Sequence, residues 1–519
     1  MSRANLIFLV GCGGVWLLLY QLIAEENRAL IAERYQLAGR TPTLRIRPAS
    51  RVAETLPVKV LLIHGLSASK SAMRQMAGEL ARWGCDCYLI DLPGHGDSTE
   101  QFSFQAASSA TDEAVGDLLP KGTDPKSDSA SLVVIGHSFG ARVALGSVRH
   151  HPEIAAVIAL SPAAEFVAQI ANVPLLIVTG EFDFPFVRRG AQFLYEQATG
   201  IRLARVEEPG RWETSTSSTR LIVLPWTDHS QTLFKPGSLR EIKLWLAKTN
   251  PAISEAPFSP EHYMRRLVFG LLHCGLSLLI WFPLAALVAD IVMPEKSVPS
   301  GFAFTGPSEN GFKLVLPYAF GASLATALLL WVNPWSRLGL MGGDYLSGFL
   351  FATGVLGFMG VRHKWELPAD TWRALLCSVV AWLILALGVS PWITAQFVHL
   401  GMNPGRLWRF PWIALGVTPF FALDEYVCRR LLQGLSTTRM VMFHLSTRFA
   451  LVIAVLTGFF VLRNGQFLLV LLLPGLLMTS FLGWSMTTWI HRKTGSALAS
   501  ALFSALATGW FFSVFFAQV

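Results

Sequence analysis

The sequence predicts a mostly parallel β-sheet with flanking helices, joined to an all-α domain that crosses a membrane several times. Three observations predict this fold class. Residues 40–250 alternate short β-branched runs with amphipathic stretches. Residues 266–519 are mostly long apolar runs separated by short polar loops. Over the whole chain of 519 residues, 52% are hydrophobic and only 15% are charged, which is more apolar than a purely soluble protein.

An uncharged apolar run at 5–24 is the first element of the chain. About 20 apolar residues suffice to cross the hydrocarbon core of a bilayer. The polar sequence EENR follows this run, and no small-residue cleavage site lies between them. We therefore expect residues 1–24 to be a retained membrane anchor rather than a cleaved signal peptide.

The α/β domain is expected at 40–250 and contains six predicted strands. Several of them are apolar throughout, which is typical of strands covered by helices on both faces. The predicted strands are 58–65, 85–92, 131–138, 154–161, 173–181 and 220–226. The stretch from 97 to 130 predicts a helix and then an exposed loop, and a linker containing three prolines is expected at 251–265.

The sequence GHSFG at 136–140 lies directly between an apolar strand and a helical stretch. This is a G-x-S-x-G motif with Ser138 at its centre. A serine on a tight strand-to-helix turn has its Oγ raised above the sheet, at the positive end of a helix dipole, and the flanking glycines leave room for that turn. Ser138 is therefore the candidate nucleophile.

Two later residues are placed to activate this serine. Asp183 and His229 each come just after a predicted strand, and the carboxyl ends of parallel strands share one edge of a sheet. A histidine held by a carboxylate takes the proton of a serine hydroxyl and returns it to the leaving group. Glu181 stays open as an alternative carboxylate, although it would still lie within its strand.

Backbone N–H groups beside the serine would stabilise a negatively charged oxygen during the reaction. The candidates are the N–H of Leu66, which follows the first predicted strand, and the N–H of Phe139, which follows Ser138. His64, His95 and His137 lie in the same loops and turns, and we expect them to structure these loops rather than to act as the base.

Together these motifs resemble the α/β-hydrolase superfamily of serine esterases and lipases, over residues 55–250. The resemblance implies the α/β-hydrolase fold, with Ser138 attacking an acyl carbonyl, His229 moving the proton and Asp183 orienting the imidazole. It implies no cofactor and no metal ion, and the six cysteines fit neither a zinc spacing nor a disulfide framework. Only about 45 residues separate Ser138 from Asp183, so no sizeable cap domain is expected over the site.

The C-terminal part contains eight apolar segments that are long enough to predict membrane spans. With the N-terminal anchor they make nine. The segments are 266–291, 312–332, 344–361, 372–395, 408–432, 440–462, 466–490 and 495–517.

One of these segments carries the charged sequence DEYVCR at 424–429. Intramembrane charges usually mark a function or a compensating pair, and Glu425 and Arg429 are four residues apart on one helix face. With Asp424 they resemble the first motif of the intramembrane CAAX-protease and bacteriocin-processing family, over residues 340–519. The positions that match the family's two histidines hold Asn464 and Ser504. Without those histidines the sequence favours a scaffold with a structural Glu425–Arg429 pair, and an intramembrane protease is the alternative.

The net charge of +8 indicates which partners to expect. From Arg265 onward there are 17 Lys and Arg residues against 8 Asp and Glu, placed at the ends of apolar segments, where they meet lipid headgroups. We therefore expect membrane lipids and an acyl or ester substrate as partners, and no nucleic acid.

These patterns predict a multi-pass protein of a bacterial inner membrane. The loops at 362–373, 433–439 and 491–493 carry six basic residues against four in the opposite loops, which favours a periplasmic hydrolase domain. The expected activity is cleavage of ester or thioester bonds in lipid-like or amphiphilic substrates, or acyl transfer. A membrane scaffold or transporter with a hydrolase-like accessory domain is a further alternative.

Overall fold

The computed structural model describes residues 3–49, 58–119, 131–163, 173–204, 206, 208–214, 218–249, 253, 256–293, 313–361, 371–432 and 436–519. The chain divides into two compact units. The sheet unit comprises Val15–Gly275, Trp392–Gly401 and Val519. The helical unit comprises Met1–Gly14, Leu276–Pro391 and Met402–Gln518. Two long helices, α1 (Arg3–Glu26) and α8 (Pro260–Val292), contribute residues to both units.

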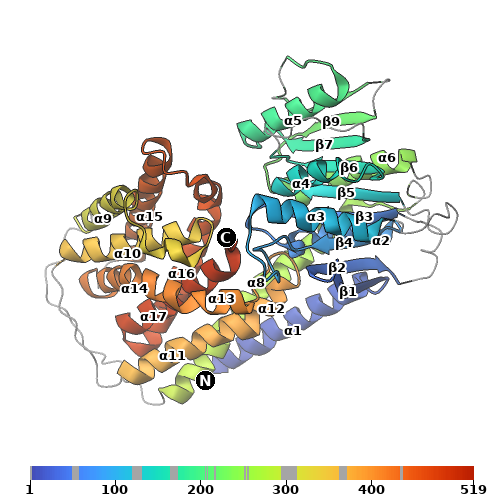
Figure 1. The fold of residues 1–519 in the computed structure, drawn as a ribbon. Helices are drawn as coiled ribbons and strands as arrows, with labels where there is room; N and C mark the ends of the chain where they lie inside the picture. The colour runs from blue at the N-terminus through green and yellow to red at the C-terminus, as the bar shows by residue number, and fades with distance from the viewer. Residues whose placement is uncertain are drawn as a thin grey trace. The chain divides into compact units, whose positions relative to one another are not determined.

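A nine-stranded sheet with the strand order β1-β2-β4-β3-β5-β6-β7-β9-β8 forms the centre of the sheet unit (Figure 1). The six strands from β4 to β9 in this order are parallel, and β1, β2 and β8 pair antiparallel at the edges. The strands are β1 (Leu30–Leu37), β2 (Thr41–Pro48), β3 (Val58–Ile63), β4 (Asp86–Ile90), β5 (Ser131–His137), β6 (Ala156–Leu160), β7 (Leu175–Gly180), β8 (Gly210–Glu213) and β9 (Thr219–Leu224).

All six strands predicted from the sequence are present, and they are the six parallel ones. The three edge strands were not predicted. β1 and β2 form a hairpin with half-exposed and charged positions, and β8 has only four residues, so none of them has the continuous apolar run of a buried strand.

Helices cover the sheet on both faces, because alternate side chains of each parallel strand point to opposite sides. Val60 and Leu62 of β3 belong to a core cluster that includes Met76 of one helix and Ile242 of another. These helices are α2 (Arg74–Arg82) and α6 (Pro236–Thr249). The helices α3 (Phe104–Leu118), α4 (Phe139–Ser147) and α5 (Pro185–Thr199) complete the unit (Figure 1). The predicted exposed loop after α3 lies outside the described residues.

The direction in which strands are added to the sheet reverses beside β3, which pairs with β4 on one side and β5 on the other. In open parallel sheets, ligands bind outside the carboxyl ends of the strands at such a switch point. The fold therefore marks the ends of β3 and β5 as the place for a site.

Charged side chains connect the end of α1 to the start of α8. Arg265 donates a hydrogen bond of 2.5 Å to the Glu26 carboxylate, and Arg266 lies 3.6 Å from the same group. Arg266 also pairs with Glu79 of α2. Since α8 begins at Pro260, the end of the predicted linker at 251–265 is already helical.

The helical unit consists of closely packed apolar helices. Besides parts of α1 and α8 and the start of α12 (Ser390–Thr394), it contains α9 (Val315–Leu328), α10 (Gly343–Met359), α11 (Thr371–Leu383), α13 (Pro404–Leu407), α14 (Arg409–Tyr426), α15 (Thr437–Phe460), α16 (Phe467–Thr494) and α17 (Ala497–Phe515). A Cβ at Gly354 would come within 2.2 Å of the Phe420 nitrogen, and one at Gly509 within 2.8 Å of Ala414. Small residues at these positions allow α14 to pack tightly against both α10 and α17.

Within the described part of the chain, five helices are long and apolar enough to cross a membrane. They are Leu6–Glu26, Pro260–Val292, Thr371–Thr394, Thr438–Phe460 and Ala497–Phe515. Each of the nine segments predicted as spans contains a helix, but α9 with 14 residues and α10 with 17 are shorter than a bilayer core requires. The sequence-based count of nine spans is therefore supported for five helices.

Candidate active site

Ser138 occupies the turn between β5 and α4, at the sheet edge marked by the strand order. Its backbone has φ 54° and ψ −115°, a conformation that L-residues rarely adopt, and its N–H donates to the Leu160 carbonyl at 2.8 Å. A Cβ at Gly136 would lie 2.3 Å from the Gly140 oxygen, and a Cβ at Gly140 would lie 2.3 Å from the Ile63 oxygen. Both glycines of the motif are needed because backbone segments meet here without room for a side chain.

The other two predicted residues lie beside this serine. His229 Nε2 is 3.0 Å from Ser138 Oγ, and His229 Nδ1 is 2.8 Å from Asp183 Oδ1. Asp183 follows the end of β7 and His229 follows the end of β9, so neighbouring parallel strands deliver both side chains to the same edge. The three side chains form one continuous hydrogen-bonded chain.

The carboxylate of Asp183 is fixed from several sides. Its oxygens accept the Thr179 hydroxyl at 3.0 Å and the Phe184 N–H at 2.8 Å, besides the His229 ring. Burial alone would raise the pKa of Asp183, but the hydrogen bond and charge of His229 outweigh it and hold that pKa below its ordinary value. Asp183 therefore stays ionised and can orient the imidazole.

Glu181, the alternative carboxylate, is occupied elsewhere. Its Oε2 accepts the backbone N–H of Trp226 at 2.8 Å. Trp226 has φ 51°, which is unusual for a bulky side chain, and its indole is 75% exposed beside the ring of Phe182. The Lys235 ammonium donates to the Trp226 carbonyl at 2.9 Å and so holds the same turn.

The rings of the remaining histidines near the site contact backbone N–H or carbonyl groups of neighbouring loops, as the sequence predicts. His64 Nε2 accepts the Leu92 N–H at 3.1 Å, and His95 Nε2 accepts the Ser67 N–H at 3.2 Å. His137 Nε2 lies 3.0 Å from the carbonyl of His229. Burial, reinforced by the neighbouring His229, lowers the pKa of His137 to about 3, so this ring stays neutral.

The two backbone amides predicted to bind an oxyanion flank the serine. Phe139 is the first residue of α4, where N–H groups have no partner within the helix. Leu66 follows Gly65, at which a Cβ would lie only 3.1 Å from the Ser138 Cβ. Both amides therefore belong to backbone beside the serine.

Aromatic rings that sequence reasoning did not single out surround the site. Phe104 is half-exposed and packs at 5.4 Å against Phe139 on one side. Phe184 packs at 5.3 Å against His229 on the other side. A search of the sequence for aromatic residues that follow a strand or begin a helix at this edge could have found them.

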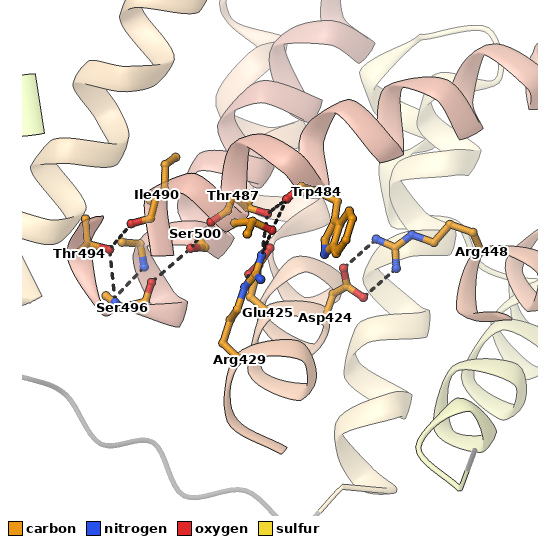
Figure 2. A network of polar contacts seen from close by, with 12 residues as sticks. Asp424, Glu425, Arg429, Arg448, Trp484, Thr487, Ile490, Thr494, Ser496 and Ser500 are labelled. Atoms are coloured by element: carbon orange, nitrogen blue, oxygen red, sulfur yellow. Dashed lines mark hydrogen bonds and ion pairs between the residues drawn. The ribbon is translucent and has the colours of Figure 1, made fainter. Parts of the chain in front are cut away.

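The predicted residues of the helical unit form a second polar cluster (Figure 2). Arg429 Nε donates to Glu425 at 2.8 Å, as their four-residue spacing predicts. Asp424 accepts two hydrogen bonds of 2.7 Å from Arg448 of α15, a pair that was not predicted. Arg429 also donates to Thr488 of α16 at 2.9 Å.

The residue that pairs with Asp424 is neither of the two that the resemblance singled out, Asn464 and Ser504. Asn464 donates to the Tyr345 hydroxyl at 3.1 Å, and Ser504 is a buried residue of α17. Arg448 meets Asp424, and the Ser480 hydroxyl lies 3.0 Å from Arg448 Nε. These partners come from other helices, so linear spacing from the first motif did not reveal them.

No cluster of three or more His, Cys, Asp or Glu side chains that could hold a metal ion is present among the described residues. The groups that meet at the candidate site are a hydroxyl, an imidazole, a carboxylate and two backbone amides.

Residues 60–303 match the family model described as the alpha/beta hydrolase family. A thermostable monoacylglycerol lipase from Bacillus sp. (strain H-257) is 30% identical over 169 residues, which are 32% of this chain. The match spans 60% of the length of that lipase, less than two thirds. This part of the chain is therefore similar to the α/β-hydrolase family.

Solved structures of hydrolases also match the chain. A predicted CIB-like hydrolase from Thermoplasma acidophilum is 18% identical, with a TM-score of 0.30, and the match covers 43% of this chain and 99% of that one. An esterase from Pyrococcus furiosus is 17% identical, with a TM-score of 0.33, and the match covers 42% of this chain and 92% of that one.

Proposed function

We propose that the sheet unit is a serine hydrolase that cleaves ester or thioester bonds of lipid-like acyl substrates at a membrane. The observation that carries this proposal is the hydrogen-bonded chain from Ser138 through His229 to Asp183, with distances of 3.0 and 2.8 Å. A chain of this kind at the carboxyl edge of a parallel sheet has the geometry of an activated nucleophile.

In the proposed reaction, His229 Nε2 takes the proton of Ser138 Oγ as that oxygen attacks the acyl carbonyl. The N–H groups of Leu66 and Phe139 stabilise the resulting oxyanion. His229 then gives the proton to the leaving alcohol or thiol, which departs and leaves an acyl-serine. Water attacks this ester with His229 again as base, His229 returns the proton to Ser138 Oγ as the acyl–oxygen bond breaks, and the acid is released. An alcohol in place of water would make the same site an acyltransferase.

Three observations support the substrate class. The match to a monoacylglycerol lipase lies in this part of the chain, exposed aromatic side chains flank the site, and apolar helices precede and follow it. We infer a multi-pass membrane protein in which the site meets acyl chains at the bilayer surface. A periplasmic hydrolase domain in a bacterial inner membrane stays the predicted orientation, although the loop residues 362–370 and 433–435 on which it partly rests lie outside the described residues.

For the helical unit we propose a scaffold rather than a protease. Both acids of its DEYVCR segment are ion-paired with arginines, so neither is free to activate water. A glutamate that acts as a general base accepts a proton from a water molecule within hydrogen-bond reach, and an ion pair with arginine disfavours that role.

A fluorophosphonate probe and a series of monoacylglycerols and p-nitrophenyl esters test the hydrolase proposal on the purified full chain. We expect covalent labelling at Ser138, ester hydrolysis that prefers medium or long acyl chains, and loss of both in Ser138→Ala. Labelling of Ser138→Ala at the wild-type level, or folded wild type without ester hydrolysis, would overturn the proposal.

A further inference from the structure

A short segment from the far end of the chain forms part of the sheet unit. Trp392–Gly401 lies more than 160 residues beyond His229 in the sequence, yet it belongs to the same compact unit. It contains the end of α12 and the turn after that helix (Figure 1). Its backbone is fixed internally, since the Leu400 N–H donates to Thr394 Oγ1 at 2.9 Å.

Phe397 attaches this segment to the loop that carries His229. Its ring packs edge-on at 6.0 Å against Phe234, which lies five residues after His229. Gly270 of α8 leaves space for it, because a Cβ there would come within 3.0 Å of the Phe397 ring. Between His229 and Phe234, the Thr232 hydroxyl donates to the His229 carbonyl at 3.0 Å. Phe397 therefore packs, through Phe234, against the turn that carries His229.

His399 contacts a second loop of the site. The side chain is buried, and its Nε2 lies 3.5 Å from Asp97 Oδ1. The other oxygen of Asp97 accepts Lys70 Nζ at 2.7 Å. Gly401 leaves room for the imidazole, since a Cβ there would be 3.0 Å from His399 Nε2.

Lys70 connects this contact to the loop that carries the oxyanion amide. It lies four residues after Leu66 and begins the short helical turn Lys70–Met73. Its backbone N–H donates to Asp91 Oδ1 at 2.8 Å, and its ammonium also pairs with Asp91. Asp91 is fully buried and accepts the Asp97 N–H at 2.8 Å, so the loops after β3 and β4 form one ionic cluster.

We propose that Phe397 and His399 are positioning residues for the hydrolase reaction: through Phe234 and Asp97 they hold the loops that carry His229 and Leu66. This inference rests on the proposed function. An error of about 1 Å in the placement of reacting groups lowers turnover strongly, so contacts behind both loops affect the rate without touching the substrate. In the sequence the segment is flanked on both sides by residues of the helical unit.

The test uses the full chain in detergent, with a short soluble p-nitrophenyl ester, the rate of fluorophosphonate labelling and the melting temperature as readouts. We expect His399→Ala to lower kcat and the labelling rate about tenfold, with KM changed less than about twofold. Val398→Ala, at a half-exposed position of the same segment, is the matched control and should keep wild-type kinetics.

Conservative variants separate positioning from a general loss of structure. A glutamine amide at this position is long enough to reach Asp97 and donate to it, whereas an asparagine is one methylene shorter. His399→Gln should therefore recover most of the rate, and His399→Asn should not. Phe397→Leu should likewise recover part of the kcat lost in Phe397→Ala. Equal rates for His399→Gln and His399→Asn, at unchanged melting temperature, would overturn the role of His399.

A double-mutant cycle tests the route through Asp97. In an Asp97→Asn background, His399→Ala should lower kcat much less than in the wild type, and full additivity would refute the route. Ser138→Ala in the same assay separates the two levels of inference. If the wild type is active through Ser138 but His399→Ala and Phe397→Ala leave kcat unchanged, the positioning inference fails and the hydrolase proposal stands. If Ser138→Ala remains active, the hydrolase proposal itself fails.

Discussion

The candidate active site and the polar cluster of the helical unit both contain buried carboxylates, but the two regions differ in how these carboxylates are paired and in how exposed their partners are. At the active site the carboxylate of Asp183 is fully buried, whereas the His229 side chain is 19% exposed and Ser138 is partly exposed. In the cluster, Glu425 is 4% exposed and its partner Arg429 7%. One arrangement leaves a serine hydroxyl partly exposed, and in the other each acid is paired with a buried arginine.

This difference separates an arrangement of polar groups that is suited to a reaction from one that is suited to stabilising the fold. The hydrogen-bonded chain at the active site ends in a hydroxyl that is open to a substrate, so its order can be used in a reaction. In the cluster, each acid is paired with an arginine. The cost of desolvating these charges is offset only while both partners of a pair are present. Removing one partner should therefore stop turnover at the first site and destabilise the fold at the second.

The largest expected effect is at Asp183. Asp183→Asn should lower kcat for ester hydrolysis by about 10³–10⁴-fold, because the neutral amide no longer holds the imidazole in the required tautomer. Glu181→Gln is the control and should lower kcat no more than a few-fold, since Glu181 binds the Trp226 amide. Steady-state kinetics and fluorophosphonate labelling measure both. A larger loss in Glu181→Gln than in Asp183→Asn would reverse the assignment of the acid.

Next in size is the loss of the buried pair in the helical unit. Glu425→Gln should destabilise the protein by roughly 3–5 kcal/mol, because the Arg429 charge would remain buried and unpaired. Adding Arg429→Met should restore part of this loss. Thermal unfolding in detergent measures the effect, and hydrolysis of a soluble ester should persist in the folded fraction. Unchanged stability together with lost cleavage of a membrane-bound peptide would instead indicate a protease.

A smaller effect is expected from pH, through His137. Its pKa is held at about 3 in the folded protein, whereas an unfolded histidine titrates near its ordinary value of roughly 6.5. Between these values the unfolded chain binds a proton that the folded chain does not, so stability falls as pH falls, by at most about 1.4 kcal/mol per pH unit. Melting temperatures of wild type and His137→Gln between pH 7 and 4.5 test this. Parallel pH slopes for the two proteins would contradict it.

The smallest expected effect concerns the strained turn at Trp226. Trp226→Asn should raise the free energy of unfolding by about 1 kcal/mol, because asparagine tolerates a positive φ far better than tryptophan. The same change should raise KM for long-chain esters more than for short ones, since an exposed aromatic side chain three residues before His229 is lost. Lower stability in Trp226→Asn would show that the indole is a structural contact.

The sequence was sufficient to predict the positions of residues that directly follow neighbouring parallel strands. Ser138, Asp183 and His229 each come after a continuously apolar strand, and parallel strands bring the residues at their carboxyl ends to one edge. The choice between Glu181 and Asp183 depended on where β7 ends, at Gly180, which places Asp183 in the loop. Edge strands β1 and β8 lacked that apolar signal and were missed.

Contacts between distant helices and turns could not be predicted in the same way. Glu425 and Arg429 share one helix face, so their spacing was informative. Arg448 reaches Asp424 from another helix, and nothing in a linear pattern specifies which helices pack together. For the same reason the contact of His399 could not be predicted, since its partner Asp97 lies about 300 residues earlier in the chain. A single sequence carries local periodicity, whereas these contacts depend on the packing of the whole unit.

The ion pair between Glu26 and Arg265 has a topological consequence. It brings the point where the chain enters the α/β domain next to the point where it leaves, so the whole domain is arranged as an insertion between two adjoining helix ends. Were both helices to cross a bilayer, two chain segments would attach the domain to it, and a single proteolytic cut beside either helix would leave the other attachment intact. Release from the membrane would require two cuts.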